Sequence, residues 1–441
     1  MAHILRTFVQ TTILLGVAAG CNNYELFQVG GYEQSTFSND ADIIFVIDNS
    51  NSMELEASEL GLNFNTFIDQ LTNPESGAPT KDTLSDAVDN YVIYTTERGR
   101  LLDYQLGITT PSVLYDDGPT AMIDPGEHGF LLGDPTVITD DLPDVGGAFR
   151  ENLLCDATCW SESTIPSDPS YVCGDDPGDV ISGEYLDCIC GFDEWQGKCG
   201  TGQEEHLEAA LLALCRAVPE PPEVCFDGVT EFDEDAVMTN PGILRDDSTI
   251  VMVIVTDEGD GSRRLDQGDE DATPYIEAFA DFERAIRFAV IGPTYDVSSG
   301  DGSCLGGATT WGTERLMQVA SETRGFYQGI TTPGSADCEP ADFGGYLVDL
   351  GDLLNNLLNS FQLAGIPDEN TIRVYVDGES VDRSDLLDGE YGATDAVYGD
   401  GWSYDPSENS VAFWGAAVPD YNSDVRIFYR PLDGKPRELP F

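Results

Sequence analysis

Basic residues and histidines are scarce in this chain of 441 residues. It contains 20 Lys and Arg against 81 Asp and Glu, and only three of the basic residues are lysines, so the formal net charge is −61. Nucleic acids and anionic lipid headgroups are bound through Lys and Arg, so this composition repels both and excludes nucleic-acid binding. The acidic residues are spread along the whole chain. We interpret them as a surface adapted to a salty or cation-rich medium rather than as a store for cations.

Catalytic signatures are also missing. The sequence has no G-x-S-x-G, H-E-x-x-H or G-x-x-x-x-G-K motif. Of three histidines, one lies near the N-terminus, and only His128 and His206 remain for acid–base or nucleophilic chemistry. The sequence therefore predicts a protein that is not an enzyme, with hydrolysis by a bound metal ion as the weakest alternative.

The first residues predict export. The stretch "MAHILRTFVQTTILLGVAAGCNN" has a short basic start with Arg6 and an apolar segment too short for a stable transmembrane helix. The small residues before Cys21 resemble the lipobox of bacterial lipoproteins, which implies a signal peptide over 1–21 and a lipid on Cys21. An ordinary signal peptide cut near Ala19 is the alternative. We expect a protein of the bacterial envelope, at the outer membrane or cell surface, that touches the membrane only through its lipid.

Cysteine usage agrees with export. Eleven cysteines are present, and setting Cys21 aside leaves an even number, which in an exported chain predicts disulfides. A zinc site is disfavoured because the spacings do not give paired C-x2-C motifs. The connectivity stays open among Cys155, Cys159, Cys173, Cys188, Cys190, Cys199, Cys215, Cys225, Cys304 and Cys338.

Alternating apolar strands and amphipathic helices follow a polar stretch over 22–38 that we interpret as a tether. Buried strands such as 249–257 are apolar on both faces, so residues 39–365 predict an α/β domain: a doubly wound, mostly parallel sheet flanked by helices. A cysteine-rich insertion is expected at about 115–199. Period-two alternation predicts a small all-β module over 366–441, either a partial sandwich or an appended sheet. Its large aromatic residues are best interpreted as core; they are Trp402, Tyr404, Phe413 and Trp414.

One strand ends in a pattern that suits a metal ion. The apolar run from Ile43 leads directly into Asp48-Asn49-Ser50-Asn51-Ser52, and a second strand ends at Asp257. In open α/β sheets, ligands bind beyond the carboxyl ends of the strands where strand order reverses. A divalent cation such as Mg²⁺ takes about six oxygen ligands, some of them water. The alternative is a simple helix start, because Asn51 and Glu54 have capping spacing.

The order and context of these residues resemble von Willebrand factor type A domains, in which D-x-S-x-S forms a metal-ion-dependent adhesion site. The resemblance implies Asp48, Ser50, Ser52 and Asp257 as ligands and Mg²⁺ as the ion, with Ca²⁺ or Mn²⁺ as alternatives. It also implies a threonine, for which Thr201 is the candidate and Thr110 the second choice. Thr201 and Glu204 equally form a capping box.

The implied function is adhesion: an envelope-anchored protein that recognises a carboxylate-bearing protein or glycan through its bound cation. A structural surface lipoprotein, in which metal only stabilises the fold, is the alternative from another class. The small β module resembles domains appended to similar bacterial surface proteins, and the sequence does not indicate an oligomeric state.

Overall fold

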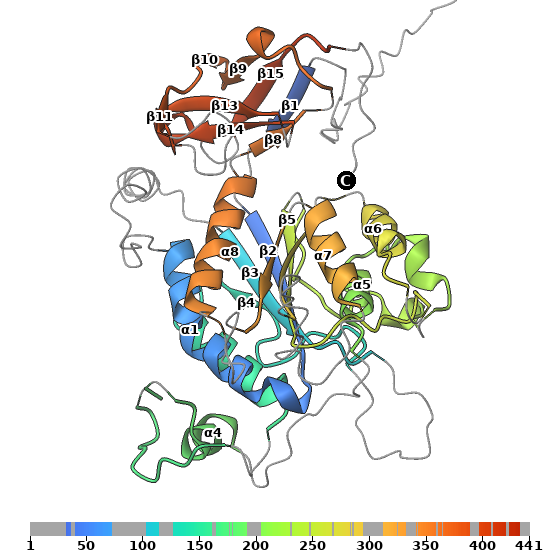
Figure 1. The fold of residues 1–441 in the computed structure, drawn as a ribbon, viewed down its shortest axis with the longest axis vertical. Helices are drawn as coiled ribbons and strands as arrows, with labels where there is room; N and C mark the ends of the chain where they lie inside the picture. The colour runs from blue at the N-terminus through green and yellow to red at the C-terminus, as the bar shows by residue number, and fades with distance from the viewer. Residues whose placement is uncertain are drawn as a thin grey trace, which may run out of the picture.

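The structure is a computed structural model of an α/β domain with an all-β module at one end of its sheet (Figure 1). It describes residues 32–36, 40–72, 103–113, 127–160, 165–175, 177–178, 180–191, 204–229, 232–246, 248–266, 269–282, 284, 286–293, 312–323, 325–331, 341, 343–358, 360–363, 365–388, 397–406, 409–419 and 423–432. The signal segment, Cys21, Thr201, Cys199, Cys304 and Cys338 lie outside these residues. In the described part no helix is long and apolar enough to cross a membrane.

The central sheet has six strands in the order β4-β3-β2-β5-β6-β7. Five run parallel, and the short edge strand β4 pairs antiparallel with β3. This confirms the expected mostly parallel sheet and adds an antiparallel edge. The strands are β2 (Asp40–Ile47), β3 (Asp103–Thr109), β4 (Ile138–Thr139), β5 (Thr249–Val255), β6 (Ile286–Gly292) and β7 (Phe326–Gly329).

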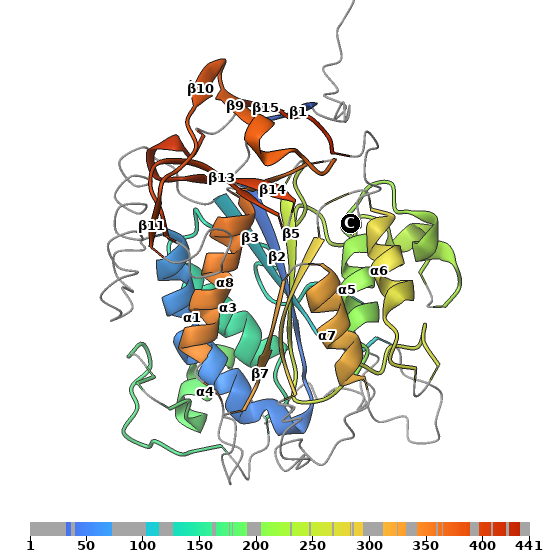
Figure 2. The same cartoon turned by 45° about the horizontal axis from the view of Figure 1, so that its top comes forward.

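Helices cover both faces of the sheet (Figure 2). One layer is α1 (Glu54–Thr72), α3 (Val145–Glu151) and α8 (Phe343–Leu358); the other is α5 (His206–Cys215), α6 (Thr273–Ala280) and α7 (Thr313–Glu322). The connections also hold α4 (Gly183–Cys190), the π-helical turn η2 (Asn152–Asp156) and the 3-10 turns η1 (Asn51–Met53), η3 (Glu223–Phe226) and η4 (Glu234–Ala236).

The double helix cover explains the uninterrupted apolar strands. In β2, Ile43 and Phe45 pack into the core under α1 and α8, while Ile44 and Val46 pack into the core under α5 and α7. Successive strand residues point to opposite faces, so a strand buried on both faces must be apolar throughout. β5 follows the same rule, and every residue from Ile250 to Val255 is buried.

The β module consists of antiparallel sheets with their own core. Its sheets run β1-β15-β9-β10, β13-β14-β8 and β11-β12. Trp402, Tyr404 and Phe413 are buried in the core and Trp414 is half-buried, as expected for packing residues. The elements are β1 (Tyr32–Thr36), β8 (Ser360–Gln362), β9 (Arg373–Val376), β10 (Glu379–Val381), β11 (Leu386–Asp388), β12 (Val397–Tyr398), β13 (Gly401–Asp405), β14 (Ser410–Trp414), β15 (Asp424–Phe428), η5 (Glu369–Thr371) and η6 (Gly415–Ala417).

Two strands of this module come from segments assigned otherwise by the sequence. Residues 32–36, within the expected tether 22–38, form β1 and pair with β15 from Tyr32↔Phe428 to Thr36↔Asp424. β8 lies within the range 39–365 expected for the α/β domain, but it pairs with β14 of the module. The α/β domain is therefore inserted into the β module. β1 escaped prediction because "YEQST" has no apolar alternation, and its backbone hydrogen bonds to β15 define it.

The expected insertion at 115–199 is also smaller than the sequence suggested. Residues 127–160 supply β4 and α3, and Phe149, Leu153 and Leu154 are fully buried in the main core. Beyond them, the disulfides Cys155–Cys190 and Cys173–Cys188 tie α4 to this part of the domain. Cys215–Cys225 joins the end of α5 to η3, and Cys159 is disulfide-bonded as well.

Candidate metal centre

The candidate site lies at the carboxyl ends of β2 and β5, at the centre of the sheet. From β2 the chain moves to β3 on one side and later to β5 on the other, so strand order reverses here. Asp48 directly follows β2, and its backbone N–H donates to Val255 O at the end of β5 (2.9 Å). Asp257 follows β5 by two residues. The predicted meeting of these two aspartates at the switch point is therefore a feature of the fold.

The loop after β2 gathers three oxygen-bearing side chains beside Asp257. Ser50 N–H donates to Asp48 Oδ1 (2.7 Å), and the hydroxyls of Ser50 and Ser52 are 2.9 Å apart. Ser52 Oγ then donates to Asp257 Oδ1 (3.2 Å). Although Ser50 is the N-cap of η1, its side chain makes no capping hydrogen bond. The serine hydroxyls thus line a common locus instead of capping the helix.

Residues directly after β5 hold the Asp48 side chain in one orientation. Thr256 Oγ1 donates to Asp48 Oδ2 (2.7 Å), and Glu258 N–H in turn donates to Thr256 Oγ1 (3.0 Å). Asp48 is 1% exposed, whereas Ser50 is half-buried and Ser52 is exposed. The site is therefore closed around Asp48 and open to solvent on the side of the serines.

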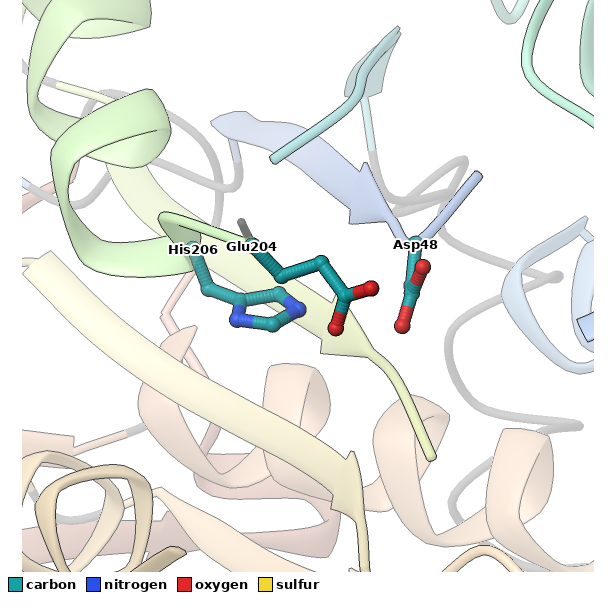
Figure 3. Close-up of side chains that lie close together, drawn as sticks. All are labelled: Asp48, Glu204 and His206. Atoms are coloured by element: carbon teal, nitrogen blue, oxygen red, sulfur yellow. The ribbon is translucent and has the colours of Figure 1, made fainter. Parts of the chain in front are cut away.

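Two further side chains complete the cluster, and the sequence did not assign them to it. Asp48, Glu204 and His206 each place one potential ligand atom within 4.8 Å of the others. Figure 3 shows the carboxyl group of Glu204 facing that of Asp48, with the imidazole of His206 beside them. Glu204 Oε2 and both ring nitrogens of His206 are buried without a hydrogen-bond partner. Leaving such a buried group unsatisfied costs about 1–3 kcal/mol.

Backbone contacts explain why Glu204 and His206 point inward. Glu205 N–H donates to Pro111 O (3.0 Å) beyond β3, and Glu204 O accepts from Gly261 N–H (2.6 Å) in the loop after β5. Helix α5 begins at His206, so Glu204 precedes the helix and does not occupy the N3 position of a capping box. The start of α5 is therefore fixed between the ends of β3 and β5.

The first turn of α5 is capped from outside the helix. Leu207 N–H donates to Asp260 Oδ1 (3.1 Å) and Glu208 N–H donates to Ser262 Oγ (3.0 Å). These bonds satisfy amides that an isolated helix leaves open. Asp260 is fully buried and also pairs with Arg315 Nη1 (3.3 Å). An arginine far along the chain therefore compensates the charge of this buried carboxylate.

Neighbouring acidic residues divide into compensated and uncompensated groups. Glu205 accepts from Arg263 Nε (2.7 Å), and Glu208 pairs with Arg264 Nη2 (3.2 Å). Within the described residues, no Arg or Lys forms a hydrogen bond or an ion pair with Asp48, Glu204 or Asp257. A buried carboxylate without a positive partner is strongly disfavoured.

The pKa values of the uncompensated carboxyls reflect this imbalance. Burial, together with the nearby charge of Asp257, raises the pKa of Asp48 to about 7. Burial and the charge of Asp48 raise the pKa of Glu204 far above its usual range, and burial raises the pKa of Asp257 and Glu258. Burial lowers the pKa of His206 to about 3, so the imidazole is neutral. A bound cation would supply the missing positive charge.

The donor set fits a divalent ion. Carboxylate and hydroxyl oxygens suit Mg²⁺, Ca²⁺ and Mn²⁺, and the buried unpartnered oxygen of Glu204 is a ligand atom without another role. Of the predicted ligands, Asp48, Ser50, Ser52 and Asp257 come together. Thr201 lies outside the described residues, and Thr110 donates its hydroxyl to Glu127 Oε2.

The comparisons with known proteins concern overall shape. No protein-family model and no curated protein sequence matches this chain. A von Willebrand factor type A structure from Catenulispora acidiphila is similar at 10% identity and TM-score 0.31, over 92% of this chain and 66% of that one. The pilus adhesin RrgA from Streptococcus pneumoniae is similar at 11% identity and TM-score 0.29, over 93% and 60%. The chain spans less than two thirds of either, and at these values the function must be argued from the site.

Proposed function

We propose that this chain is an exported, lipid-anchored binding protein of the bacterial envelope, similar in its site to von Willebrand factor type A domains. It binds a divalent cation at the carboxyl ends of β2 and β5 and, through that cation, a carboxylate on a partner protein or glycan. The observation that carries the proposal is the hydrogen-bonded series Ser50, Ser52 and Asp257 beside the buried Asp48. The lack of catalytic motifs in the sequence supports binding rather than catalysis.

The exposure of the site supports recognition of an external group. Asp48 and Glu204 lie on the closed side and would hold the ion, whereas Ser52 is exposed. A partner carboxylate would approach from the serine side. Neutral hydroxyl ligands there leave the ion positively charged toward the partner, so its attraction for a carboxylate is retained.

Among the described residues, the β module does not cover this side of the molecule. The β module is joined to the sheet through β1, which precedes β2, and through β8, which follows α8. It lies at the end of the sheet where β2 begins, opposite the carboxyl ends (Figure 1). The candidate site would therefore face away from the β module.

Binding to acidic ligand arrays tests the proposal. The mature chain would be applied to arrays of acidic glycans and of peptides containing Asp or Glu, each beside its amide or methyl ester. We expect capture by the free carboxylates in Mg²⁺ or Mn²⁺, none by the esters, and none in EDTA. Asp48→Ala should abolish capture, while Asp266→Ala, which removes an exposed carboxylate, should not. A folded protein that binds cation without cation-dependent capture would indicate the structural role instead.

A further inference from the structure

His206 is a buried side chain whose surroundings do not account for it. It is 0% exposed, and neither of its ring nitrogens has a hydrogen-bond partner. Apolar residues follow it in α5, and an apolar side chain would fill this position without leaving polar atoms unsatisfied. An imidazole in such a place needs a partner that binds nitrogen.

The ring is oriented for that role. Nδ1 lies 3.9 Å from Asp260 Oδ1, which is itself fixed by Arg315 and by the first turn of α5. This leaves Nε2 on the side of Glu204 and Asp48, where Figure 3 shows a ring nitrogen facing the two carboxyl groups. Metal-binding histidines commonly direct their second nitrogen to a carboxylate, which fixes the ring and strengthens the ligand.

We propose that the cation site is a mixed nitrogen and oxygen site, in which His206 joins Asp48 and Glu204 as a ligand and selects a first-row transition metal. The inference rests on the proposed function, because it concerns the same cation. Imidazole suits later first-row metals such as Zn²⁺ and Ni²⁺, whereas Mg²⁺ and Ca²⁺ prefer oxygen alone. Two short segments supply these three donors: the residue after β2 and the residues around the start of α5.

The ligand set differs from what the D-x-S-x-S motif implies. The motif supplies hydroxyls and points to Mg²⁺, and the expected further ligand was a threonine at Thr201. Among the described residues, Glu204 brings a second carboxyl group close to Asp48, and His206 adds a nitrogen. Mg²⁺ and a divalent transition metal carry the same charge, so the imidazole decides the preference between them.

A spectroscopic experiment can isolate His206, because the chain has few histidines. The sequence contains three, and the first lies in the signal segment. In a mature chain without a histidine tag, His128→Asn leaves His206 as the single imidazole. Asn is suited to the position because His128 has a φ of 51°. Mn²⁺ bound to this protein would be examined by pulsed EPR for coupling to nitrogen, with and without ¹⁵N-labelled histidine.

We expect imidazole nitrogen coupling that shifts with the isotope, and Co²⁺ and Zn²⁺ affinities at least about tenfold higher than the Mg²⁺ affinity. His206→Leu should remove the coupling and weaken Co²⁺ binding by at least about tenfold, with little change for Mg²⁺. If His206→Leu does not fold, the coupling measured in the single-histidine protein still decides the matter.

The outcomes separate the two proposals. Cation binding that requires Asp48 but shows no nitrogen coupling and no preference over Mg²⁺ would overturn the role of His206 and leave the proposed function standing. Absence of any site that depends on Asp48 would overturn both. Nitrogen coupling that persists in His206→Leu would assign the signal to another ligand and also contradict the inference.

Discussion

Stability without metal should depend on pH through Asp48. Its pKa rises from 3.8 to about 7 in the folded protein, because the carboxyl is buried beside Asp257. The folded state therefore keeps a proton that the unfolded chain loses over this range. The stabilising contribution of the protonated carboxyl is complete below pH 3.8 and is lost as pH rises through about 7. The rise in pKa corresponds to about 4 kcal/mol.

Asp48→Asn provides the test, because an amide keeps the shape and the acceptor for Ser50 N–H but cannot ionise. In EDTA and high salt, the free energy of unfolding would be measured by urea denaturation of both proteins between pH 4 and 8. From pH 4 to 8, we expect the free energy of unfolding of the variant to rise relative to that of the wild type by up to about 4 kcal/mol. Comparing the two proteins cancels the repulsion among acidic residues away from the site, because it is the same in both.

Added cation should make the wild type more stable than Asp48→Asn at high pH. At pH 8 the ionised Asp48 of the wild type binds the ion and is stabilised by it, whereas Asp48→Asn has lost the charge. At pH 5 protons compete for the same carboxyls, so the gain from cation should be smaller. A stability difference that stays constant from pH 4 to 8, with or without cation, would refute the argument that Asp48 is a buried, uncompensated carboxyl.

Other consequences concern the fold. Phe149→Ala should lower the free energy of unfolding by about 3–5 kcal/mol, because its ring stacks on Phe64 and meets Phe45 edge-on; a change below about 1 kcal/mol would place it outside the core. Removing residues 32–36 should expose the edge of β15 and speed proteolysis of the β module, while a chain beginning at residue 22 should resist; equal cleavage would contradict the β1 pairing. Raising NaCl from about 0.1 to 1 M shortens the screening length from about 10 to 3 Å, so the melting temperature should rise, and a fall would argue against charge repulsion.

The fold class could be predicted because the strands are buried on both faces. Apolar runs such as 249–257 stand out from the acidic background, and helical periodicity identified the covering layers. The edge strands β1 and β4 were not predicted, because they are short and their sequences carry no apolar alternation. Their positions depend on backbone hydrogen bonds to distant partners, which sequence patterns do not encode.

Only the part of the candidate site that directly follows β2 and β5 could be predicted from the sequence. Asp48 and Asp257 were found because each follows an apolar strand, and parallel strands end at the same edge. Glu204 and His206 were assigned to a helix start, where such residues are common. Their inward orientation is set by Pro111 and Gly261, which belong to other connections. The signal that would have found them is an acidic pair, Glu204 and Glu205, followed by a histidine at the start of a mostly apolar helix.

Isothermal titration of the mature chain with Mg²⁺, Ca²⁺ and Mn²⁺ in high-salt buffer tests the central claim most directly. Wild type would be measured beside Asp48→Ala and the control Asp266→Ala, with circular dichroism to verify folding. We expect one saturable site in the wild type and in the control, and none in Asp48→Ala. Equal binding by all three proteins, or by none, would contradict the claim that the carboxyl ends of β2 and β5 form a cation site.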